Sequence, residues 1–532
     1  MGSTSHGDTT TTGPAKGSRS RALLAGGLLA FSLVVLSALA AGVAPAASAA
    51  ATVAPTDWYS SAPFVSNPSA NAWYRIPAVI KNAQGELLAF AERRDNDTDT
   101  DSGDFDVVMR KSTDGGRTWG PLKTVADDAD SRVSNPVPLL DPLTGDVLLV
   151  TCVKKNTLDA ATELFMQRSE DGGDSFSELA SGPVRPAGAW KRGLAGPGHG
   201  IVLAHGAHAG RIIFAMGYKS SGIYGGYGIY SDDGGHTWSI GYDQPDTSGK
   251  IAYIEGTIAE LPDGTLFISY RDKTGTAAGT TRYCAYSTDG GESLVSGFVQ
   301  QSALKIHSVQ GSALDTTGTY AGQLLFSAPT LTSAFDPTLR RDMGIYVSKD
   351  SGRTWSLPYL VDLESKPAAY SDLVQLDDTS VGILYETGTV RWREQIMFRR
   401  VSIAQITNPT KVVSSVKAQL STRSVPIKKA AKLKVLVRVG GIGSPPGEFV
   451  VKYLNASKKR VSIAVPLTYS NKGLRYISLP VLKKGVYPVS VYYQGTRRIR
   501  PSAVYAGYFR VGPKPKTKPK AKSVLIVHSL PK

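Results

Sequence analysis

One eight-residue phrase occurs five times in this 532-residue chain and limits what the chain can fold into. Each copy has Ser at its first position, Asp at its third, Gly at its fifth, and Trp, Phe or Leu at its eighth. Successive copies begin between 56 and 62 residues apart. A phrase that recurs at a nearly constant period indicates one supersecondary unit repeated in space. The copies are Ser112–Trp119, Ser169–Phe176, Ser231–Trp238, Ser287–Leu294 and Ser348–Trp355.

The phrase has the chemistry of a turn between two strands. Its Asp carboxylate can accept hydrogen bonds from backbone N–H groups about two residues on, and its Gly permits a positive φ. The large apolar residue at its end needs burial, so it would hold the turn against the sheet. About 60 residues suffice for four strands of about 6 residues with their loops. The repeats therefore predict an all-β fold whose units are arranged radially, a β-propeller.

The first 49 residues have the composition of a secretory signal peptide. Arg19 and Arg21 precede an apolar run over 22–41, and Ala47, Ser48 and Ala49 offer small residues for cleavage. A membrane anchor is the alternative, because the apolar run approaches the length of a spanning helix. No later segment of the sequence could span a bilayer, so we expect a secreted, extracellular protein and not an integral membrane protein.

Basic residues are concentrated after residue 410. From Lys411 to the end there are 26 Lys and Arg against one acidic residue, Glu448. The first 410 residues carry 34 Lys and Arg against 43 Asp and Glu. Such an asymmetry marks two parts with different partners, and the basic part should attract an anionic polymer such as one on a cell surface. No nucleic-acid recognition motif accompanies the charge, so nucleic acid is not an expected partner.

Alternating polar and apolar runs between 411 and 512 predict a small β-sandwich of six or seven strands. Lys432–Val439 and Gly485–Tyr493 are two of these runs. Lys and Pro alternate after Gly512, which is typical of a disordered tail. The predicted domains are a signal peptide at 1–49, a propeller at 50–410, a sandwich at 411–512 and a tail at 513–532.

Several segments carry residues that a turn repeat does not need. An Arg stands inside an apolar strand just before Ile76 and Pro77, and a buried Arg requires an anionic partner. An acidic loop over 95–106 precedes the first copy of the phrase. The other candidates follow the third copy or flank the fifth. The residues singled out are Arg75, Asp101, Glu255, Arg271, Arg340 and Tyr370.

In these features, residues 74–399 resemble the secreted bacterial exo-α-sialidases, or neuraminidases. The resemblance rests on the segment Tyr74–Pro77, on the five Asp-containing phrases (Asp boxes), and on an Arg, a Glu, an Arg and a Tyr in matching order. It implies a six-bladed propeller whose sixth blade lacks a box, with the site in a central pit. It also implies hydrolysis of terminal sialic acid from glycans. Residues 485–502 resemble the end of bacterial immunoglobulin-like repeats, which implies an immunoglobulin-like sandwich.

The same resemblance implies which residues bind the substrate. Arg75, Arg271 and Arg340 would hold the carboxylate of sialic acid, because guanidinium forks form charge-assisted hydrogen bonds with carboxylates. Arg94 would contact a hydroxyl of the sugar ring. No cofactor is expected, and the chain is expected to be monomeric.

The resemblance also implies three catalytic residues. Tyr370 would be the nucleophile and Glu255 its base, an arrangement that avoids repulsion between a carboxylate nucleophile and the anionic substrate. The hydrogen bond of the pair and the nearby arginines would favour phenolate character. Asp101 would protonate the leaving oxygen and later activate water. Asp99 is the alternative to Asp101, because the length of this loop varies among related sialidases.

Other interpretations remain for the acidic loop and for the whole chain. Asp97, Asp99 and Asp101 alternate as in a calcium loop, although Gly103 stands one place late for the sharp turn. The histidines at 199, 205 and 208 lack an accompanying Cys or carboxylate, so no metal site is expected. The alternative functions are a catalytically inactive lectin or adhesin that binds sialoglycans and an intramolecular trans-sialidase.

Overall fold

The computed structural model describes most of the chain from residue 59 to residue 512. The predicted signal peptide at 1–49 and the predicted tail at 513–532 lie outside the described residues, and so do Asp101 and the other residues of its loop between 96 and 102. The described ranges are 59–95, 103–129, 131–155, 162–187, 191–274, 282–330, 340–362, 366–408, 411–439, 445, 447–455, 457, 459–467, 471–495 and 499–512.

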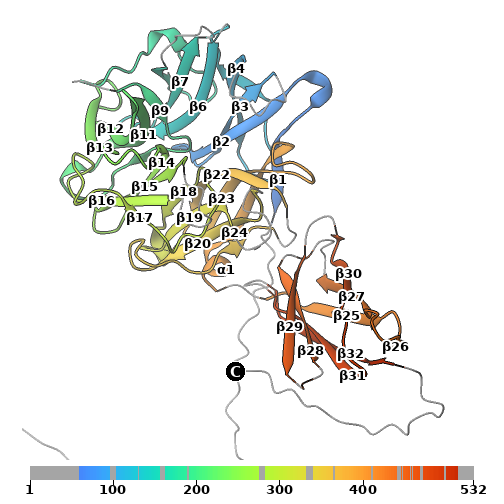
Figure 1. Cartoon of the computed structure of the whole chain (residues 1–532). Helices are drawn as coiled ribbons and strands as arrows, with labels where there is room; N and C mark the ends of the chain where they lie inside the picture. Colours follow the sequence, from blue (N-terminus) through green and yellow to red (C-terminus); the bar gives the residue numbers. More distant parts are fainter. Residues whose placement is uncertain are drawn as a thin grey trace, which may run out of the picture. The chain divides into compact units, whose positions relative to one another are not determined.

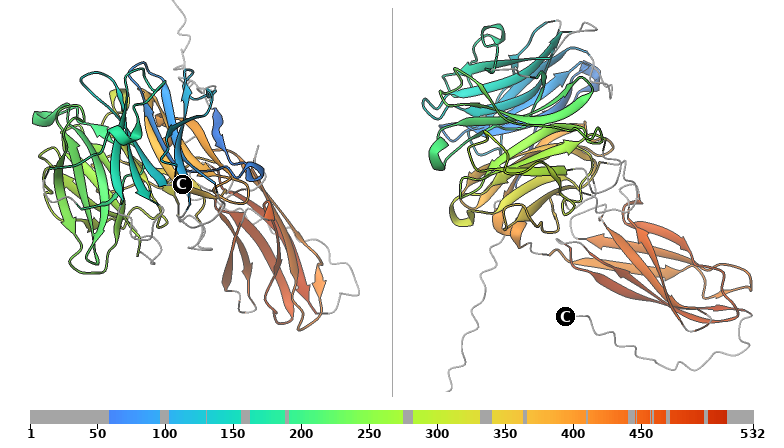
Figure 2. Two further views of the ribbon diagram at one scale, coloured as in Figure 1. Left: turned by 90° about the horizontal axis from the view of Figure 1, so that it is seen from above. Right: turned by 60° about the vertical axis from the view of Figure 1, so that its left-hand side comes forward.

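Between residues 60 and 407 the described strands form five sheets around a common centre, the arrangement of a β-propeller (Figures 1 and 2). The largest sheet contains β2 to β8. Its strands β4 and β6 meet only at the parallel pair of Phe105 and Arg132, so it consists of two antiparallel groups. The strands are β2 (Trp73–Lys81), β3 (Leu87–Arg94), β4 (Phe105–Ser112), β5 (Lys123–Ala126), β6 (Ser131–Leu140), β7 (Val147–Lys155) and β8 (Glu163–Ser169).

Three further sheets follow in chain order, each built mainly from successive antiparallel strands. The first contains β9 (Gly193–Ala195), β10 (Ile201–Val202), β11 (Ile212–Ser220), β12 (Ile223–Ser231) and β13 (Ser239–Pro245). The second contains β14 (Tyr253–Glu260), β15 (Leu266–Asp272), β16 (Arg282–Ser287) and β17 (Val299–Gln300). The third contains β18 (Ser312–Asp315), β19 (Leu324–Pro329), β20 (Met343–Ser348) and β21 (Tyr359–Leu360).

The last sheet closes the ring with strands from both ends of this region. β1 (Ser60–Val65) pairs with β24 (Gln395–Ser402), which continues through β23 (Ser380–Thr387) to β22 (Ala368–Asp377). Among the described residues, the helices are few and short: η1 (Pro68–Ala70), η2 (Leu179–Ser181), η3 (Gly206–His208), η4 (Gly318–Tyr320) and α1 (Ile403–Thr407). Within the described ranges, no helix has the length and apolarity needed to cross a membrane.

The repeated phrases form turns at strand ends, as predicted. In the first copy, Asp114 Oδ1 accepts hydrogen bonds from the backbone N–H groups of Arg117 and Thr118, both at 2.9 Å. These bonds reach three and four residues along the chain, further than the two expected. Trp119 packs edge-on against Phe398 of a neighbouring sheet, with ring centroids 5.5 Å apart. The apolar end of the phrase therefore joins adjacent sheets as well as fixing its own turn.

Strands near the centre are interrupted where the candidate site lies. The pairing of β2 shifts between Arg75 and Ala78, and that of β14 shifts between Ile254 and Gly256. Within these irregular stretches, Ile76 and Glu255 have positive φ values of 55° and 49°, which are uncommon for residues other than Gly. A bulge bends a strand and re-aims its side chains. The two irregularities thus break the regular alternation of side chains around Arg75 and at Glu255.

Residues 414–511 form two sheets that share one apolar core. Val435 and Val437 from one sheet belong to the same buried cluster as Val451 and Val491 from the other. Eight strands are described here, against the six or seven that were predicted. One sheet contains β25 (Ser414–Leu420), β27 (Lys432–Val439) and β30 (Leu474–Ser478); the other contains β26 (Ser424–Val425), β32 (Ser502–Val511), β31 (Gly485–Tyr493), β28 (Glu448–Leu454) and β29 (Arg460–Pro466).

Candidate active site

A tyrosine and a glutamate from different sheets form the centre of the candidate site. Tyr370 lies on β22 and Glu255 lies on β14, and the Tyr370 hydroxyl donates a short hydrogen bond to Glu255 Oε1. Each residue is only 8% exposed. A phenol held against a carboxylate in this way can lose its proton to that carboxylate as it attacks an electrophile.

Arg271 and Arg340 stand beside this pair. Arg271 Nη1, from β15, lies 2.7 Å from Glu255 Oε2 and 3.4 Å from the Tyr370 hydroxyl. Arg271 Nε donates to Ser308 Oγ at 3.2 Å, and Arg340 Nη2 donates to the Ser308 carbonyl at 3.2 Å. The backbone and side chain of Ser308 therefore fix both guanidinium groups relative to each other, a role that the sequence analysis missed.

Arg75 is held by a buried glutamate. Its Nε donates to Glu386 Oε1 at 2.7 Å, and the guanidinium carbon lies 5.4 Å from the centre of the Tyr370 ring. Glu386 Oε1 also accepts from Ile76 N at 2.9 Å, and its Oε2 accepts from Tyr370 N at 3.2 Å. Glu386 thus fixes both Arg75 and the backbone of Tyr370. A carboxylate in the fully buried strand β23 is the sequence signal that could have identified it.

The titration of the central pair differs from the expectation. Burial acts to raise the pKa of Glu255, but Arg271 and the hydrogen bond from Tyr370 lower it below its ordinary value. Burial and the Glu255 charge raise the pKa of Tyr370, and the arginines only partly oppose this. The direction of both pKa shifts favours a neutral phenol bonded to an ionised carboxylate and opposes the expected phenolate character.

The site keeps an excess of positive charge. Although burial opposes it, the Glu386 carboxylate raises the pKa of Arg75, and Glu255 likewise raises that of Arg271. Burial lowers the pKa of Arg340, with Arg271 and Arg75 acting in the same direction. Among the residues that the structure describes, no carboxylate lies within ion-pair distance of Arg340. An anionic ligand would supply the missing partner.

A second network lies next to Tyr370 and crosses between sheets. Asp372, fully buried on β22, accepts from Val79 N at 2.9 Å and from Ser312 Oγ at 2.8 Å. It also accepts from His199 N at 3.0 Å and lies 2.7 Å from His199 Nδ1. Burial acts to lower the pKa of His199, but the Asp372 charge raises it above its ordinary value. The segment 196–200, which contains His199, therefore fixes the strand of Tyr370.

The remaining predicted residues lie apart from the central pair or outside the described ranges. Arg94 Nε donates to Glu92 Oε2 at 2.8 Å, and Glu92 lies opposite Arg75 in the pairing of β2 with β3. Arg94 therefore adjoins the site through Glu92. Asp101 and Asp99 fall outside the described residues, and most of the loop considered for calcium falls there with them. Over the residues that can be assessed, no group of three or more His, Cys, Asp or Glu side chains could hold a metal ion.

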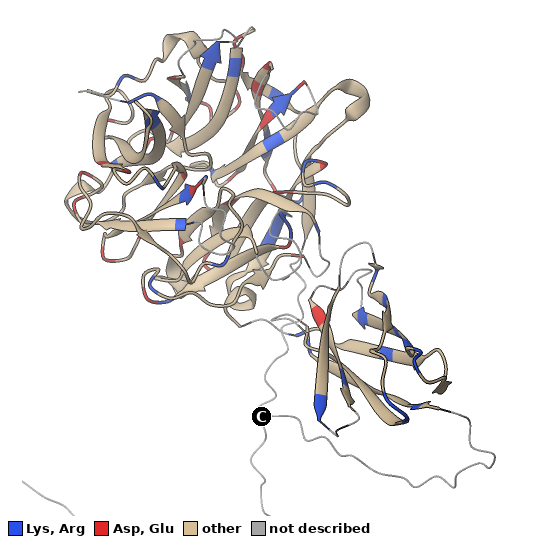
Figure 3. Ribbon diagram, viewed as in Figure 1, with Lys and Arg blue, Asp and Glu red and all other residues tan. Residues whose placement is uncertain are grey.

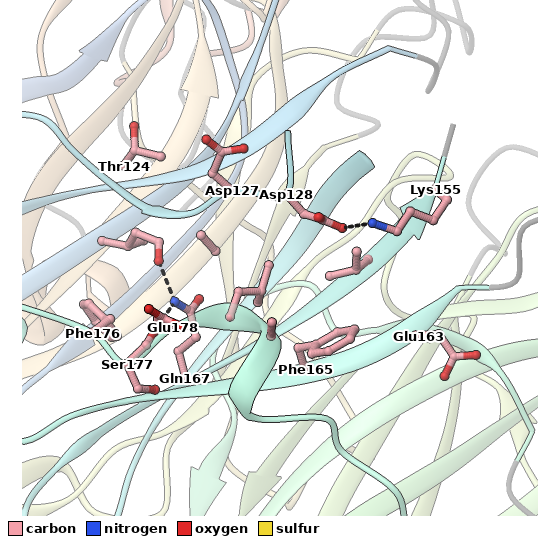
Figure 4. Close-up of a pocket in the computed structure, with 15 residues that line it drawn as sticks. Thr124, Asp127, Asp128, Lys155, Glu163, Phe165, Gln167, Phe176, Ser177 and Glu178 are labelled. Carbon is pink, nitrogen blue, oxygen red and sulfur yellow. Dashed lines mark hydrogen bonds and ion pairs between the residues drawn. The ribbon is translucent and has the colours of Figure 1, made fainter. Parts of the chain in front are cut away.

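A cavity of about 770 Å³ lies elsewhere, between β5 and the strands β7 and β8 (Figure 4). Its charged lining includes Asp127, Asp128, Glu163 and Lys155, and Lys155 pairs with Asp128 at 2.7 Å. None of the arginines of the candidate site lines it. A carboxylate-rich lining repels an anionic ligand, so the size of this cavity does not make it a rival for the arginine-rich site.

Comparisons with known proteins agree with the repeats and with the fold. The BNR repeat-like domain family matches residues 85–383. The chain is 29% identical over 334 residues to a sialidase of Micromonospora viridifaciens, which covers 59% of this chain and 50% of that protein. It is 26% identical over 349 residues to a sialidase of Bacteroides fragilis, covering 60% of each.

The chain thus spans half to three-fifths of the length of these two relatives. Among solved structures, a Hadza microbial sialidase is 25% identical with a TM-score of 0.53, covering 63% of this chain and 66% of that one. A leech intramolecular trans-sialidase is 20% identical with a TM-score of 0.53, and the match covers 66% of this chain and 71% of the leech chain. This second likeness supports the fold alone. The predicted resemblance is confirmed: the chain belongs to the BNR repeat-like family, and its curated relatives are sialidases.

Proposed function

We propose that this protein is a secreted exo-α-sialidase that removes terminal sialic acid from glycoproteins, glycolipids or oligosaccharides with net retention. The observation that carries the proposal is the hydrogen bond from Tyr370 to Glu255 beside three arginines. A nucleophile with its base accounts for bond cleavage, and an incompletely neutralised arginine cluster accounts for an anionic sugar.

Binding would place the sugar for attack. Its carboxylate would pair with Arg75, Arg271 and Arg340, of which Arg340 has no carboxylate partner among the described residues. Arg94 would contact a ring hydroxyl from its position beside Glu92. The buried guanidinium groups are strong partners for the substrate because water does not screen them.

Two displacements at the anomeric carbon would follow. In the first, the Tyr370 oxygen would bond to the anomeric carbon as its proton passes to Glu255, and Asp101 would protonate the departing glycosidic oxygen. In the second, Asp101 would take a proton from water, the water oxygen would replace the tyrosine, and Glu255 would return the proton to Tyr370. Two inversions give net retention. The neutral resting phenol fits this scheme, because the proton leaves only during attack.

The architecture completes the proposal. The two antiparallel groups of the largest sheet and the four other sheets of the propeller would form six blades, and β22, β23, β24 and β1 would be the sixth blade, which lacks a box. Residues 50–410 would be the catalytic propeller and 411–512 an immunoglobulin-like domain, preceded by a signal peptide. The basic C-terminal region would attach the enzyme to an anionic polymer at a cell surface.

Release of the fluorophore from a fluorogenic α-sialoside tests whether the protein is a sialidase. We expect release at some pH between about 4 and 8. Binding of sialosides without any release across this range would identify a lectin instead. Proton NMR of the first product separates hydrolysis from the intramolecular reaction: free α-sialic acid supports our proposal, and an anhydro sugar contradicts it.

The identity of the acid can be tested with leaving groups of different acidity. Asp101→Ala should reduce hydrolysis of natural glycosides by about 10²-fold or more, while activated aryl sialosides lose far less, because a good leaving group needs no proton. Asp99→Ala is the matched control in the same loop. If Asp99→Ala shows the dependence on the leaving group and Asp101→Ala does not, the acid is Asp99.

A further inference from the structure

The five-stranded sheet of the C-terminal sandwich presents tyrosines on its outer face. Tyr505 and Tyr508 on β32 are 59% and 46% exposed. On β31 the buried residues are Tyr487, Val489, Val491 and Tyr493, so the alternation of a strand places Tyr492 on the outer face. Exposed apolar groups gathered on one face commonly mark an interaction site.

The strand register places polar groups between these rings. Tyr505 lies opposite Ser490, Ser490 opposite Lys452, and Lys452 opposite Ser462. This row crosses β32, β31, β28 and β29 and presents a ring, a hydroxyl, a cation and a second hydroxyl. Lys452 Nζ lies 5.5 Å from the centre of the Tyr492 ring, so the next row is in contact with the first.

Nearly all the charged side chains of this sandwich are positive. Glu448 is its single acidic residue, and Gln494 Nε2 donates a hydrogen bond of 2.6 Å to its carboxylate. Lys452, Arg460 and Arg510 belong to the outer, alternate positions of their strands. Figure 3 shows Lys and Arg on several strands of the sandwich and far fewer acidic positions. The face therefore attracts polyanions.

We propose that this outer face binds an acidic polysaccharide that carries carboxylate groups. Tyrosine rings offer flat apolar faces for the C–H faces of sugar rings, and their hydroxyls and the serines offer hydrogen bonds to sugar hydroxyls. Lys452, Arg460 and Arg510 pair with the carboxylates. Single-stranded nucleic acid also stacks on aromatic rings above cations, but hydroxyls at both Ser490 and Ser462 favour a polyhydroxylated ligand. The inference rests on the proposed attachment role and not on catalysis.

The other sheet of the sandwich provides a matched comparison. Its outer face carries Lys417, Lys432, Lys434 and Arg438 but one tyrosine, Tyr476, which is 69% exposed. Lys434 Nζ lies 5.8 Å from the centre of that ring. This face has the positive charge but lacks a group of tyrosines such as Tyr492, Tyr505 and Tyr508. It therefore separates specific binding from attraction of any polyanion.

The test measures binding of the full chain to polygalacturonate, to neutral dextran and to an oligothymidylate at one salt concentration. We expect binding to polygalacturonate and none to dextran. Tyr505→Ala with Tyr508→Ala should weaken polygalacturonate binding about tenfold or more, whereas Tyr476→Ala should change it less than about twofold. Lys452→Ala should weaken it several-fold, and Lys432→Ala much less. All these residues are exposed, so equal melting temperatures should verify that the variants fold.

Three outcomes would overturn the inference. Tighter binding of oligothymidylate than of polygalacturonate would identify a nucleic-acid face. Equal losses for Tyr476→Ala and for the Tyr505/Tyr508 pair, or dependence on the number of cations alone, would mean nonspecific attraction. No binding of polygalacturonate would exclude the face as such a site. Cleavage of a small sialoside is measured in parallel. If the unaltered protein does not cleave it, the result counts against the proposed hydrolysis and not against polysaccharide binding by this face.

Discussion

Two positive charges of the propeller site are buried, whereas the positive charges compared with them on the sandwich are exposed. Arg75 and Arg271 are buried and bonded to Glu386 and Glu255, each at 2.7 Å. On the sandwich, Lys452 lies exposed beside an aromatic ring. Buried charges interact strongly and cannot lose a partner cheaply, whereas exposed charges act through a field that salt weakens.

This difference concerns how each region can position a ligand. In the candidate active site, each guanidinium has one orientation fixed by a carboxylate or by Ser308. On the proposed polysaccharide face of the sandwich, the rings and hydroxyls would set the position of the ligand, and the exposed charges would add an attraction that salt weakens. The following predictions, arranged from the largest expected effect to the smallest, are designed to break this contrast or to sharpen it.

Removing the nucleophile should have the largest effect. Tyr370→Phe deletes the hydroxyl that bonds Glu255, so we expect kcat on a fluorogenic sialoside to fall at least about 10³-fold. Tyr346→Phe is the control, because its buried hydroxyl donates to the Lys305 carbonyl outside the site. Steady-state kinetics measure both. A Tyr370→Phe enzyme with a tenth or more of the original kcat would exclude this residue as the nucleophile.

Breaking a buried pair should cost stability. Glu386→Gln leaves Arg75 buried without its carboxylate, and we expect the free energy of unfolding to fall by about 3–5 kcal/mol. Lys155→Gln breaks the exposed pair with Asp128 and should cost less than about 1 kcal/mol. Chemical denaturation of both variants measures the difference. Equal losses would contradict the contrast between buried and exposed charge.

The pair of His199 and Asp372 should make stability depend on pH. The pKa of His199 is raised in the folded protein. The contribution of the pair to the free energy of unfolding is therefore complete below the ordinary His pKa of about 6.5 and is lost as pH rises through the folded value. His199→Gln should remove this part of the pH dependence. Melting temperatures recorded from acidic to alkaline pH test the slope. A slope unchanged in His199→Gln would assign it to other groups.

Salt should act on the two regions differently. Raising NaCl about tenfold should weaken binding of an acidic polysaccharide about tenfold or more, because its partners are exposed. The same change should alter kcat/KM for a small sialoside less than about threefold, since Arg75 and Arg271 are buried. Both quantities are measured on one preparation. A comparable salt dependence for both would show that salt screens the arginines of the candidate active site as well.

Local sequence was sufficient to predict the repeated parts of the fold. Each Asp box contains its own hydrogen-bond partners within four residues, as Asp114 and Thr118 show, so its turn needs no distant information. The strand Lys432–Val439 also has the predicted bounds, because one of its faces is buried and the other is solvated. These features follow from periods of two residues and from short-range turns.

Distant partners were beyond local sequence. His199 and Asp372 are separated by 173 positions, and no spacing rule connects them. Glu386 was visible as a carboxylate in an apolar strand, but its pairing with Arg75 spans 311 positions. The raised pKa of Tyr370 follows mainly from burial, which the sequence does not quantify. The resemblance supplied the candidate residues, and the geometry supplied their neighbours.

The pairing of β1 with β24 has a consequence for how the chain reaches this structure. Ser60 lies opposite Arg399, so the last sheet cannot form until more than 300 residues have been synthesised. Until then, β1 is an unpaired strand on a long chain that emerges slowly from the ribosome. Loop closure over this distance is a late and slow step of folding. Tyr370 lies on β22, which belongs to the same sheet as β1 and β24. We therefore expect activity to develop only after β1 has paired with β24, well after the Asp-box turns have formed.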